Sequence, residues 1–350
     1  MILTVTGCYG TGSSAVTDLI REFEGISCIS DSEIRILHDP DGVSDLEYSL
    51  IENPNRHNSS QSIKRFKKRM YELDHIWFVR RFSRYFGKGF LKAADRYVDE
   101  LTVLNYHGTW HYDEYDRGRL FFILSRLLQK AELSASKILK MPPHSWGLIS
   151  KNEDAYLTIT EEDAFLNATK RFVNNLCRLI QNGGTDFYFI DQFIPPSNFS
   201  RYLRYAPDIR AVLVERDPRD IYLMEKAVWG GGVAPTDSVK KYCQWYRWTR
   251  NLYEKTPLPE QVILIRFEDL IFNYEETKNR IIEHFGIQEL LHQKALQYFV
   301  PEKSVVNTQV WKKIQKYKRE ITYIEHELKQ YCYDFEHAGI IRSEYKGRLF

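Results

Sequence analysis

Short apolar runs rich in β-branched residues recur along the chain, and each is bounded by turn or polar residues. They lie at residues 2–5, 27–30, 187–190, 211–214 and 262–265. Longer stretches in which apolar side chains recur at helical spacing separate these runs. The alternation predicts an α/β fold with a mostly parallel central sheet flanked by helices.

The spacing of the runs also predicts how the chain is organised. No internal repeat or low-complexity linker divides residues 1–350, so we expect a single α/β domain with a large, mainly helical insertion from about 39 to 182. Inside it, residues 62–97 combine Lys, Arg and aromatic side chains at helical spacing. This segment is either an amphipathic helix pair with a solvated basic face or an electropositive wall for an acidic sugar, a lipid-linked substrate or a membrane surface.

Composition narrows the class of protein. The 49 Lys and Arg against 47 Asp and Glu leave a net charge of +2, which gives no general attraction to nucleic acid. Five scattered cysteines without a CxxC spacing argue against a disulfide framework and against a zinc site. No apolar run has the length of a membrane span and no leader pattern precedes the first strand, so we expect a cytoplasmic protein that can touch a membrane surface peripherally.

The first predicted strand runs directly into a glycine-rich loop, GCYGTGSS, at residues 7–14. Such a loop followed by a helix presents backbone N–H groups to an anion, although a tight strand-to-helix turn is the alternative. The nucleotide-binding pattern GxxxxGK[ST] fits in its glycines but places Ser13 where the lysine belongs. The dinucleotide pattern GxGxxG fails in its spacing.

Two later segments of the sequence help to interpret this loop. AVLVERDPRDIYL places a buried strand ahead of Arg216, and VILIRFEDLIFNYEETKNRIIEHFGI combines a strand, a turn and an amphipathic helix. In this order, and with a long segment between them, the three resemble the sulfotransferases that use 3′-phosphoadenosine 5′-phosphosulfate (PAPS) as the sulfuryl donor. The resemblance covers both ends of the α/β core, leaves most of the insertion unmatched, and implies a fold like that of P-loop nucleotide-binding proteins.

The resemblance implies a donor site. The loop would cradle the 5′-phosphosulfate, Arg216 would bind the 3′-phosphate, and Arg219 is a second candidate for that role. A basic segment near residues 301–318 would cover the donor, with Trp311 stacking on adenine and Lys312 meeting a phosphate. The alternatives are a surface ion pair for Arg216 and an ordinary helix start for the basic segment. The loop residues implied are Gly10, Thr11, Gly12, Ser13 and Ser14.

The resemblance also implies a base, and the residues suggest a substrate pocket. Glu33, in DSEIRILHD, would accept a proton from the acceptor, unless it is an exposed glutamate or a partner of Arg35. His107 and His111 lie four residues apart among aromatic residues, which favours a sugar pocket over a metal site, with buried core histidines as the alternative. Asp191 and Gln192 follow a predicted strand and could contact acceptor or donor.

The sequence therefore predicts a sulfotransferase that moves a sulfuryl group from PAPS to a hydroxyl, or an amine, of a saccharide or glycolipid, without a metal. Bacterial polysaccharide or glycolipid synthesis would be a fitting context. One alternative is a P-loop kinase or NTPase that uses Ser13 and Asp191 around magnesium. Another is a catalytically inactive nucleotide-binding module, because Gly10 and Met224 stand where many relatives have a basic residue and a serine.

Overall fold

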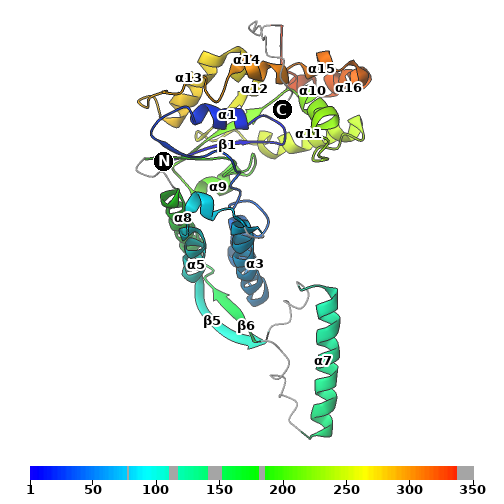
Figure 1. The fold of residues 1–350 in the computed structure, drawn as a ribbon. Coiled ribbons are helices and arrows are strands. Elements are labelled where there is room, and N and C mark those ends of the chain that lie inside the picture. The colour runs from blue at the N-terminus through cyan, green and yellow to red at the C-terminus, as the bar shows by residue number, and fades with distance from the viewer. Residues whose placement is uncertain (77–78, 110–116, 141–151, 181–185, 337–350) are drawn as a thin grey trace. The chain divides into compact units, whose positions relative to one another are not determined.

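A five-stranded, entirely parallel sheet forms the centre of the computed structural model, which describes residues 1–76, 79–109, 117–140, 152–180 and 186–336 (Figure 1). Its strand order is β2-β7-β1-β8-β9. Each strand contains or overlaps one of the five apolar runs, so the predicted α/β fold class is confirmed. The strands are β1 (Ile2–Gly7), β2 (Ile26–Ile29), β7 (Phe187–Ile190), β8 (Ile209–Glu215) and β9 (Val262–Arg266).

The order of the strands determines where a ligand can bind. Strand β1 lies in the middle of the sheet, between β7 and β8, and Gly7 is paired in register with Val214. The chain passes from β1 to one side of the sheet and crosses later to the other side at β8. In open α/β sheets such a switch point opens a crevice at the carboxyl ends of the strands. The loops after β1, β7 and β8 therefore begin next to one another.

Contact density divides the chain into two units, and the sheet belongs to the first, Met1–His38 with Tyr85–Gly87 and Val173–Phe350. Apolar residues of β1, β8 and β9 form one core with α1, α12 and α13, and α9 lies on the opposite side of the sheet (Figure 1). The helices of this unit are α1 (Ser14–Ile20), α9 (Phe199–Tyr205), α10 (Pro218–Leu223), the π-helix Met224–Trp229, α11 (Val239–Glu254), α12 (Phe267–Phe272), α13 (Tyr274–Phe285), α14 (Pro301–Ser304), α15 (Val310–Lys313), α16 (Lys318–Glu327) and the short 3₁₀ turns Val305–Asn307, Gln315–Tyr317 and Lys329–Tyr331.

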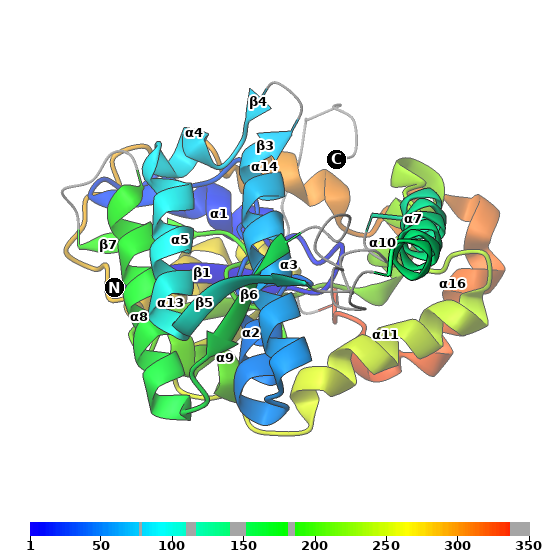
Figure 2. The same ribbon diagram turned by 90° about the horizontal axis from the view of Figure 1, so that it is seen from below.

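The second unit comprises Asp39–Arg84 and Lys88–Phe172. Helices α3 and α5 run side by side within it, and Tyr97 stacks on Phe172 with ring centroids 4.6 Å apart (Figure 2). The unit is not purely helical, because β5 and β6 form an antiparallel pair. Its elements are α2 (Val43–Glu47), the π-helix Tyr48–Glu52, α3 (Arg56–Asp74), β3 (His75–Ile76), β4 (Val79–Arg80), α5 (Gly89–Leu101), β5 (Thr102–Thr109), α7 (Arg119–Ile138) and β6 (Asn152–Thr158); α4 (Ser83–Phe86) and α8 (Glu162–Leu179) have residues in both units.

The basic segment 62–97 contains most of α3 and most of α5, with β3, β4 and α4 between them. Apolar side chains of both helices are buried, among them Phe66 and Phe90, which agrees with an amphipathic helix pair. No helix among the described residues is both long enough and apolar enough to cross a membrane.

Candidate functional site

The loop between β1 and α1 is a tight turn held by its own hydrogen bonds. The Thr11 amide donates to the Cys8 carbonyl oxygen at 3.2 Å, and the Thr11 hydroxyl donates to the same oxygen at 2.9 Å. Gly10 and Gly12 have φ of +80° and +82°, which side chains rarely allow. Among the described residues, no acceptor is recorded for the amides of Gly10, Gly12 and Ser13, so these N–H groups remain available to a ligand.

Close packing explains why two loop positions are glycine. A Cβ on Gly12 would lie 2.7 Å from the ring of Phe267, the residue that follows β9. A Cβ on Gly10 would lie 3.2 Å from Ile221 on α10. The loop backbone is therefore pressed against the segments that follow β8 and β9, in a shape that larger residues would change.

A buried carboxylate fixes the outer part of the loop. The Tyr9 hydroxyl donates to Glu225 Oε2 at 2.7 Å, and the Gly232 amide donates to Oε1 of the same residue. Burial and the Glu225 carboxylate raise the pKa of Tyr9 to about 12, so the phenol stays a donor. The ring of Trp229 meets that of Tyr9 edge to face, with centroids 5.8 Å apart. The segment after α10 thus supports the loop.

Arg216 follows β8 directly and lies two residues after Val214, which pairs with Gly7. Its side chain is buried, with 3% exposure. Its Nη1 donates to the Gly10 carbonyl at 3.2 Å and its Nη2 to the Asn307 carbonyl at 2.5 Å. Its guanidinium carbon lies 4.8 Å from the centre of the Phe267 ring, its Nε has no partner, and it takes part in no ion pair with a described residue. A buried cation that makes no direct ion pair is costly, and the buried Asp220 carboxyl, whose pKa Arg216 lowers, balances it only from a longer range, so this position favours an anion.

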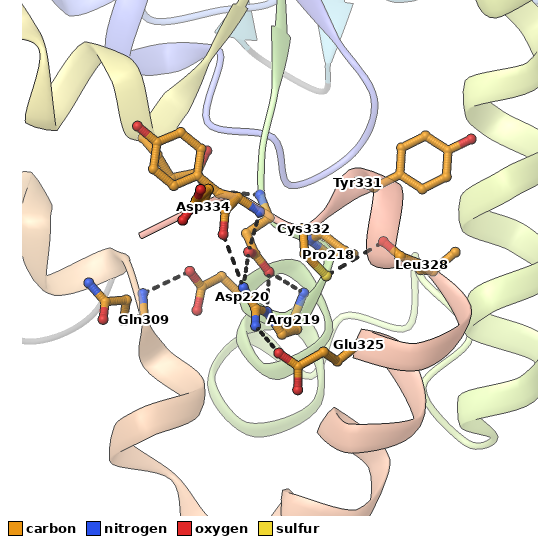
Figure 3. Close-up of polar contacts among 12 residues, drawn as sticks. Pro218, Arg219, Asp220, Gln309, Glu325, Leu328, Tyr331, Cys332 and Asp334 are labelled. Atoms are coloured by element: carbon orange, nitrogen blue, oxygen red, sulfur yellow. Dashed lines mark hydrogen bonds and ion pairs between the residues drawn. The ribbon is translucent and has the colours of Figure 1, made fainter. Parts of the chain in front are cut away.

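The other charged residues of RDPRD have structural partners (Figure 3). Asp217 caps α10 and accepts from Arg219 Nε and Nη2 at 3.0 and 2.7 Å. Arg219 Nη1 also donates to Glu325 at 2.8 Å. Asp220 accepts the amides of Gln309 and Val310 at 2.8 and 2.7 Å. The Arg219 guanidinium is therefore directly paired with carboxylates of the protein, whereas Arg216 makes no such ion pair among the described residues.

The predicted covering segment reaches this network at two points. The Asn307 carbonyl contacts Arg216, and the Trp311 ring lies under the Arg219 guanidinium, 4.4 Å from ring centre to carbon. The buried indole N–H of Trp311 has no acceptor among the described residues. Lys312 is exposed, and its ammonium lies 5.2 Å from the Trp311 ring centre. One face of Trp311 is thus already occupied by an arginine.

Asp191 and Gln192 lie at the carboxyl end of β7, beneath the loop. Asp191 is 8% exposed; its Oδ2 accepts from the Thr17 hydroxyl at 3.1 Å, while Oδ1 has no described partner. Burial, with a smaller contribution from the Glu33 charge, raises the pKa of Asp191 to about 7. Gln192 donates to Ser13 Oγ at 3.0 Å, which ties this strand end to the loop.

Glu33 lies close to the same edge of the sheet, because the Ile34 amide donates to the Asp191 carbonyl at 3.0 Å. The Glu33 side chain is 53% exposed and its Oε2 lies 3.4 Å from Arg35. This is the exposed ion pair that the sequence left open as the alternative to a base. Its carboxylate is nevertheless accessible to a substrate at this edge.

The predicted histidine pair is only partly described. His107, on β5, lies 2.8 Å from Asp154 on β6 and is largely exposed, so it is not a core histidine. His111 lies outside the described residues. Among the described residues, no group of three His, Cys, Asp or Glu side chains could hold a metal ion.

Several contributors to the site were not predicted. Thr17 binds Asp191, Phe267 packs on Gly12 and Arg216, and Glu268 accepts the Asp217 amide at 2.7 Å. Phe267 and Glu268 follow β9 directly, as Arg216 follows β8. This position at the carboxyl end of a predicted strand could have marked them as site residues. Nothing in the spacing pointed to Thr17.

Comparison with known proteins gives a similarity in structure alone. No family model matches the sequence, and no curated protein matches it. A sulfotransferase from Mycobacterium tuberculosis is 10% identical, with a TM-score of 0.34 over 88% of this chain and 76% of that one. Retinol dehydratase, solved with androsterone and the inactive cofactor PAP, is 13% identical, with a TM-score of 0.29 over 95% and 82%. Similarity this low does not assign an activity, which has to be argued from the site itself.

Proposed function

We propose that the chain is a sulfotransferase that binds PAPS at the carboxyl edge of its sheet. The observation that carries the proposal is Arg216, a buried guanidinium that contacts the glycine loop and makes no direct ion pair with a described residue. Its position after a buried strand, in RDP, matches the arginine that binds the 3′-phosphate in the family which the sequence resembles. A phosphate dianion would supply a directly paired negative charge, and the guanidinium offers it a fixed fork of donors.

The remaining groups at this edge support the transfer reaction. The free amides of Gly10, Gly12 and Ser13 suit the oxygens of a phosphosulfate. When bound, PAPS supplies a sulfuryl group, which leaves the bridging phosphate oxygen as the acceptor oxygen bonds to sulfur. Glu33 is the proposed proton acceptor for that hydroxyl. The loop lacks a basic side chain, so backbone donors and Arg216 would balance the charge on the departing bisphosphate.

The proposed acceptor is a saccharide, free or linked to a lipid. Asp191 and Gln192 supply carboxyl and amide groups at the edge where the hydroxyl must approach, and such side chains bond sugar hydroxyls. His107 and His111 stay predictions for acceptor binding that come from the sequence alone. A screen of saccharides in the presence of the bound donor would identify the acceptor.

The test is a calorimetric titration of the whole chain with adenosine 3′,5′-bisphosphate, with and without magnesium. We expect binding that is independent of magnesium and at least about a hundredfold weaker in Arg216→Ala, because a charged hydrogen-bonding group is lost from a buried site. Arg319→Ala removes an exposed arginine of α16 and is the matched control. It should bind like the unchanged protein.

The same titration with ATP and GTP tests the alternative activity. Magnesium-dependent binding of a triphosphate, without binding of the bisphosphate, would show that the loop serves a kinase or NTPase. Binding of the bisphosphate without transfer to any acceptor of a broad panel would point to an inactive nucleotide-binding module. Either result would overturn the proposed activity.

A further inference from the structure

Helix α7 presents an apolar face to solvent. It spans 20 residues, Arg119–Ile138, as one continuous helix, and none of its residues is buried (Figure 1). At about 100° per residue, its large apolar side chains fall mainly within an arc of about 160°. The members of this arc are 37 to 85% exposed: Leu120, Phe121, Ile123, Leu124, Leu127, Leu128 and Ile138.

The basic residues of α7 follow one edge of this arc. Arg119, Arg126, Lys130 and Lys137 are separated by seven, four and seven residues, which places them in one stripe along the helix. Arg126 also contacts Gln129 and the Phe122 ring on its own helix. The single acidic residue, Glu132, falls on the far side of the arc. Residues 117–140 carry six basic side chains and this one acidic side chain.

The partly buried positions of α7 show which side of the helix is the more exposed to solvent. Residues 122, 125, 126, 129, 132 and 136 have intermediate exposure, and all fall outside the apolar arc. The apolar face is thus the more exposed side. An exposed apolar face of this size marks a surface that binds something other than water.

We propose that α7 binds in the plane of an anionic lipid surface. A helix that carries an apolar face flanked by lysine and arginine, and that is too charged to span a bilayer, has the properties of an interfacial helix. The leucine and isoleucine side chains enter the acyl boundary, and the basic stripe lies at the level of the lipid phosphates. This surface shares no residue with the proposed donor site, and the proposal does not depend on the proposed activity.

A second copy of the chain is a poorer occupant for this face. Pairing two α7 helices along the seam of Leu120, Leu124, Leu127 and Ile138 would place Ala131 and Ser134 in the same seam, which leaves the centre of a coiled coil poorly packed. It would also bring the two basic stripes to the edges of the interface with little acidic charge to meet them. A lipid surface binds an apolar face without regularly spaced interlocking side chains, and its anionic headgroups supply the charge that meets the basic stripe.

The experiment is flotation of the full chain with vesicles, of phosphatidylcholine alone or with roughly 30% phosphatidylserine. We expect binding to the anionic vesicles only, falling as salt rises to about 0.5 M. Arg126→Gln with Lys130→Gln should weaken it about thirtyfold. The control, Lys318→Gln with Arg319→Gln, removes two exposed basic residues from α16 and should leave binding unchanged.

A second pair of variants tests the apolar face. Leu124→Ser with Leu127→Ser should weaken vesicle binding at least about tenfold, whereas Leu252→Ser with Leu291→Ser, which removes two exposed leucines elsewhere, should not. No difference between these pairs, or equal binding to neutral vesicles, would overturn the proposal. So would a change of oligomeric state in the α7 variants, measured by analytical ultracentrifugation, without a change in vesicle binding.

Discussion

Arg216 Nη1 donates a hydrogen bond to the Gly10 carbonyl oxygen, 3.2 Å away, and so joins the segment after β8 to the loop after β1. Both segments start at the carboxyl ends of neighbouring strands, and the pairing of Gly7 with Val214 sets their relative positions. The contact therefore follows from the sheet topology. It places the buried charge of Arg216 beside the loop in which the amides of Gly10, Gly12 and Ser13 have no acceptor among the described residues.

The two arginines of RDPRD should differ in their effect on stability. Arg216→Met removes a buried cation that makes no direct ion pair with a described residue and should change the free energy of unfolding by about 1 kcal/mol or less. Arg219→Met leaves Asp217 buried without its ion pair and should lower it by about 3–5 kcal/mol. Urea unfolding of both variants measures the difference. Equal losses would mean that Arg216 has a structural role like that of Arg219.

Loop packing gives a graded prediction at three glycines. All three have positive φ, but a Cβ would lie 2.7 Å from its nearest neighbour at Gly12, 3.2 Å at Gly10 and beyond 4 Å at Gly232. We expect Gly12→Ala to be the most destabilising, by about 2–4 kcal/mol, with Gly232→Ala near 1 kcal/mol from backbone strain alone. Gly10→Ala should fall between them. Chemical denaturation would reveal a different order.

The fold could be predicted because local pattern determines it. Five apolar runs became the five strands, since a strand buried on both faces needs such a run whatever lies elsewhere in the chain. The position of Arg216 at the carboxyl edge follows from the same pattern. Its contact with Asn307 does not, because that residue lies 91 positions away and no spacing rule connects the two.

Contacts between residues far apart in the sequence also explain why Arg219 and Arg216 differ in their surroundings. Both are arginines within one short motif, and the resemblance implied Arg216 as the ligand of the 3′-phosphate with Arg219 as a second candidate. Their difference depends on Glu325, 106 positions from Arg219, and on the side-chain geometry that lets Asp217 bind Arg219 with both oxygens. For Glu33, the sequence offered an ion pair with Arg35 as one of several possibilities. It could not show that this pair forms or that the Glu33 side chain is exposed.

The two carboxyl groups at the edge of the sheet should have separable roles in transfer. Glu33→Gln should lower the turnover of PAPS with a productive acceptor by about a hundredfold or more while leaving bisphosphate affinity unchanged. Arg35→Gln, which removes the ion-pair partner and keeps the carboxylate, is the control and should remain active. Full activity of Glu33→Gln together with loss in Asp191→Asn would transfer the role of base to Asp191.

The pKa of Asp191 predicts how stability depends on pH. The folded carboxyl keeps its proton up to a pKa of about 7, while the ordinary value, which applies to the unfolded chain, is 3.8. Between these values the folded state binds more protons than the unfolded state, so this group lowers the free energy of unfolding as pH rises. Asn keeps an acceptor for the Thr17 hydroxyl but does not ionise. Asp191→Asn should therefore gain stability over the unchanged protein across this range, by up to about 4 kcal/mol.

Urea unfolding at a series of pH values measures that difference. Asp163→Asn, which alters an exposed carboxyl of α8, is the control and should follow the unchanged protein at every pH. Asp220 and Glu268 are also buried with raised pKa values, so both proteins should lose some stability as pH rises from the ordinary values of 3.8 and 4.5 toward the raised ones, and only the difference between them reports on Asp191. A difference that stays constant from pH 4 to pH 8 would mean that Asp191 is already ionised in the folded protein, held by a partner at its free oxygen.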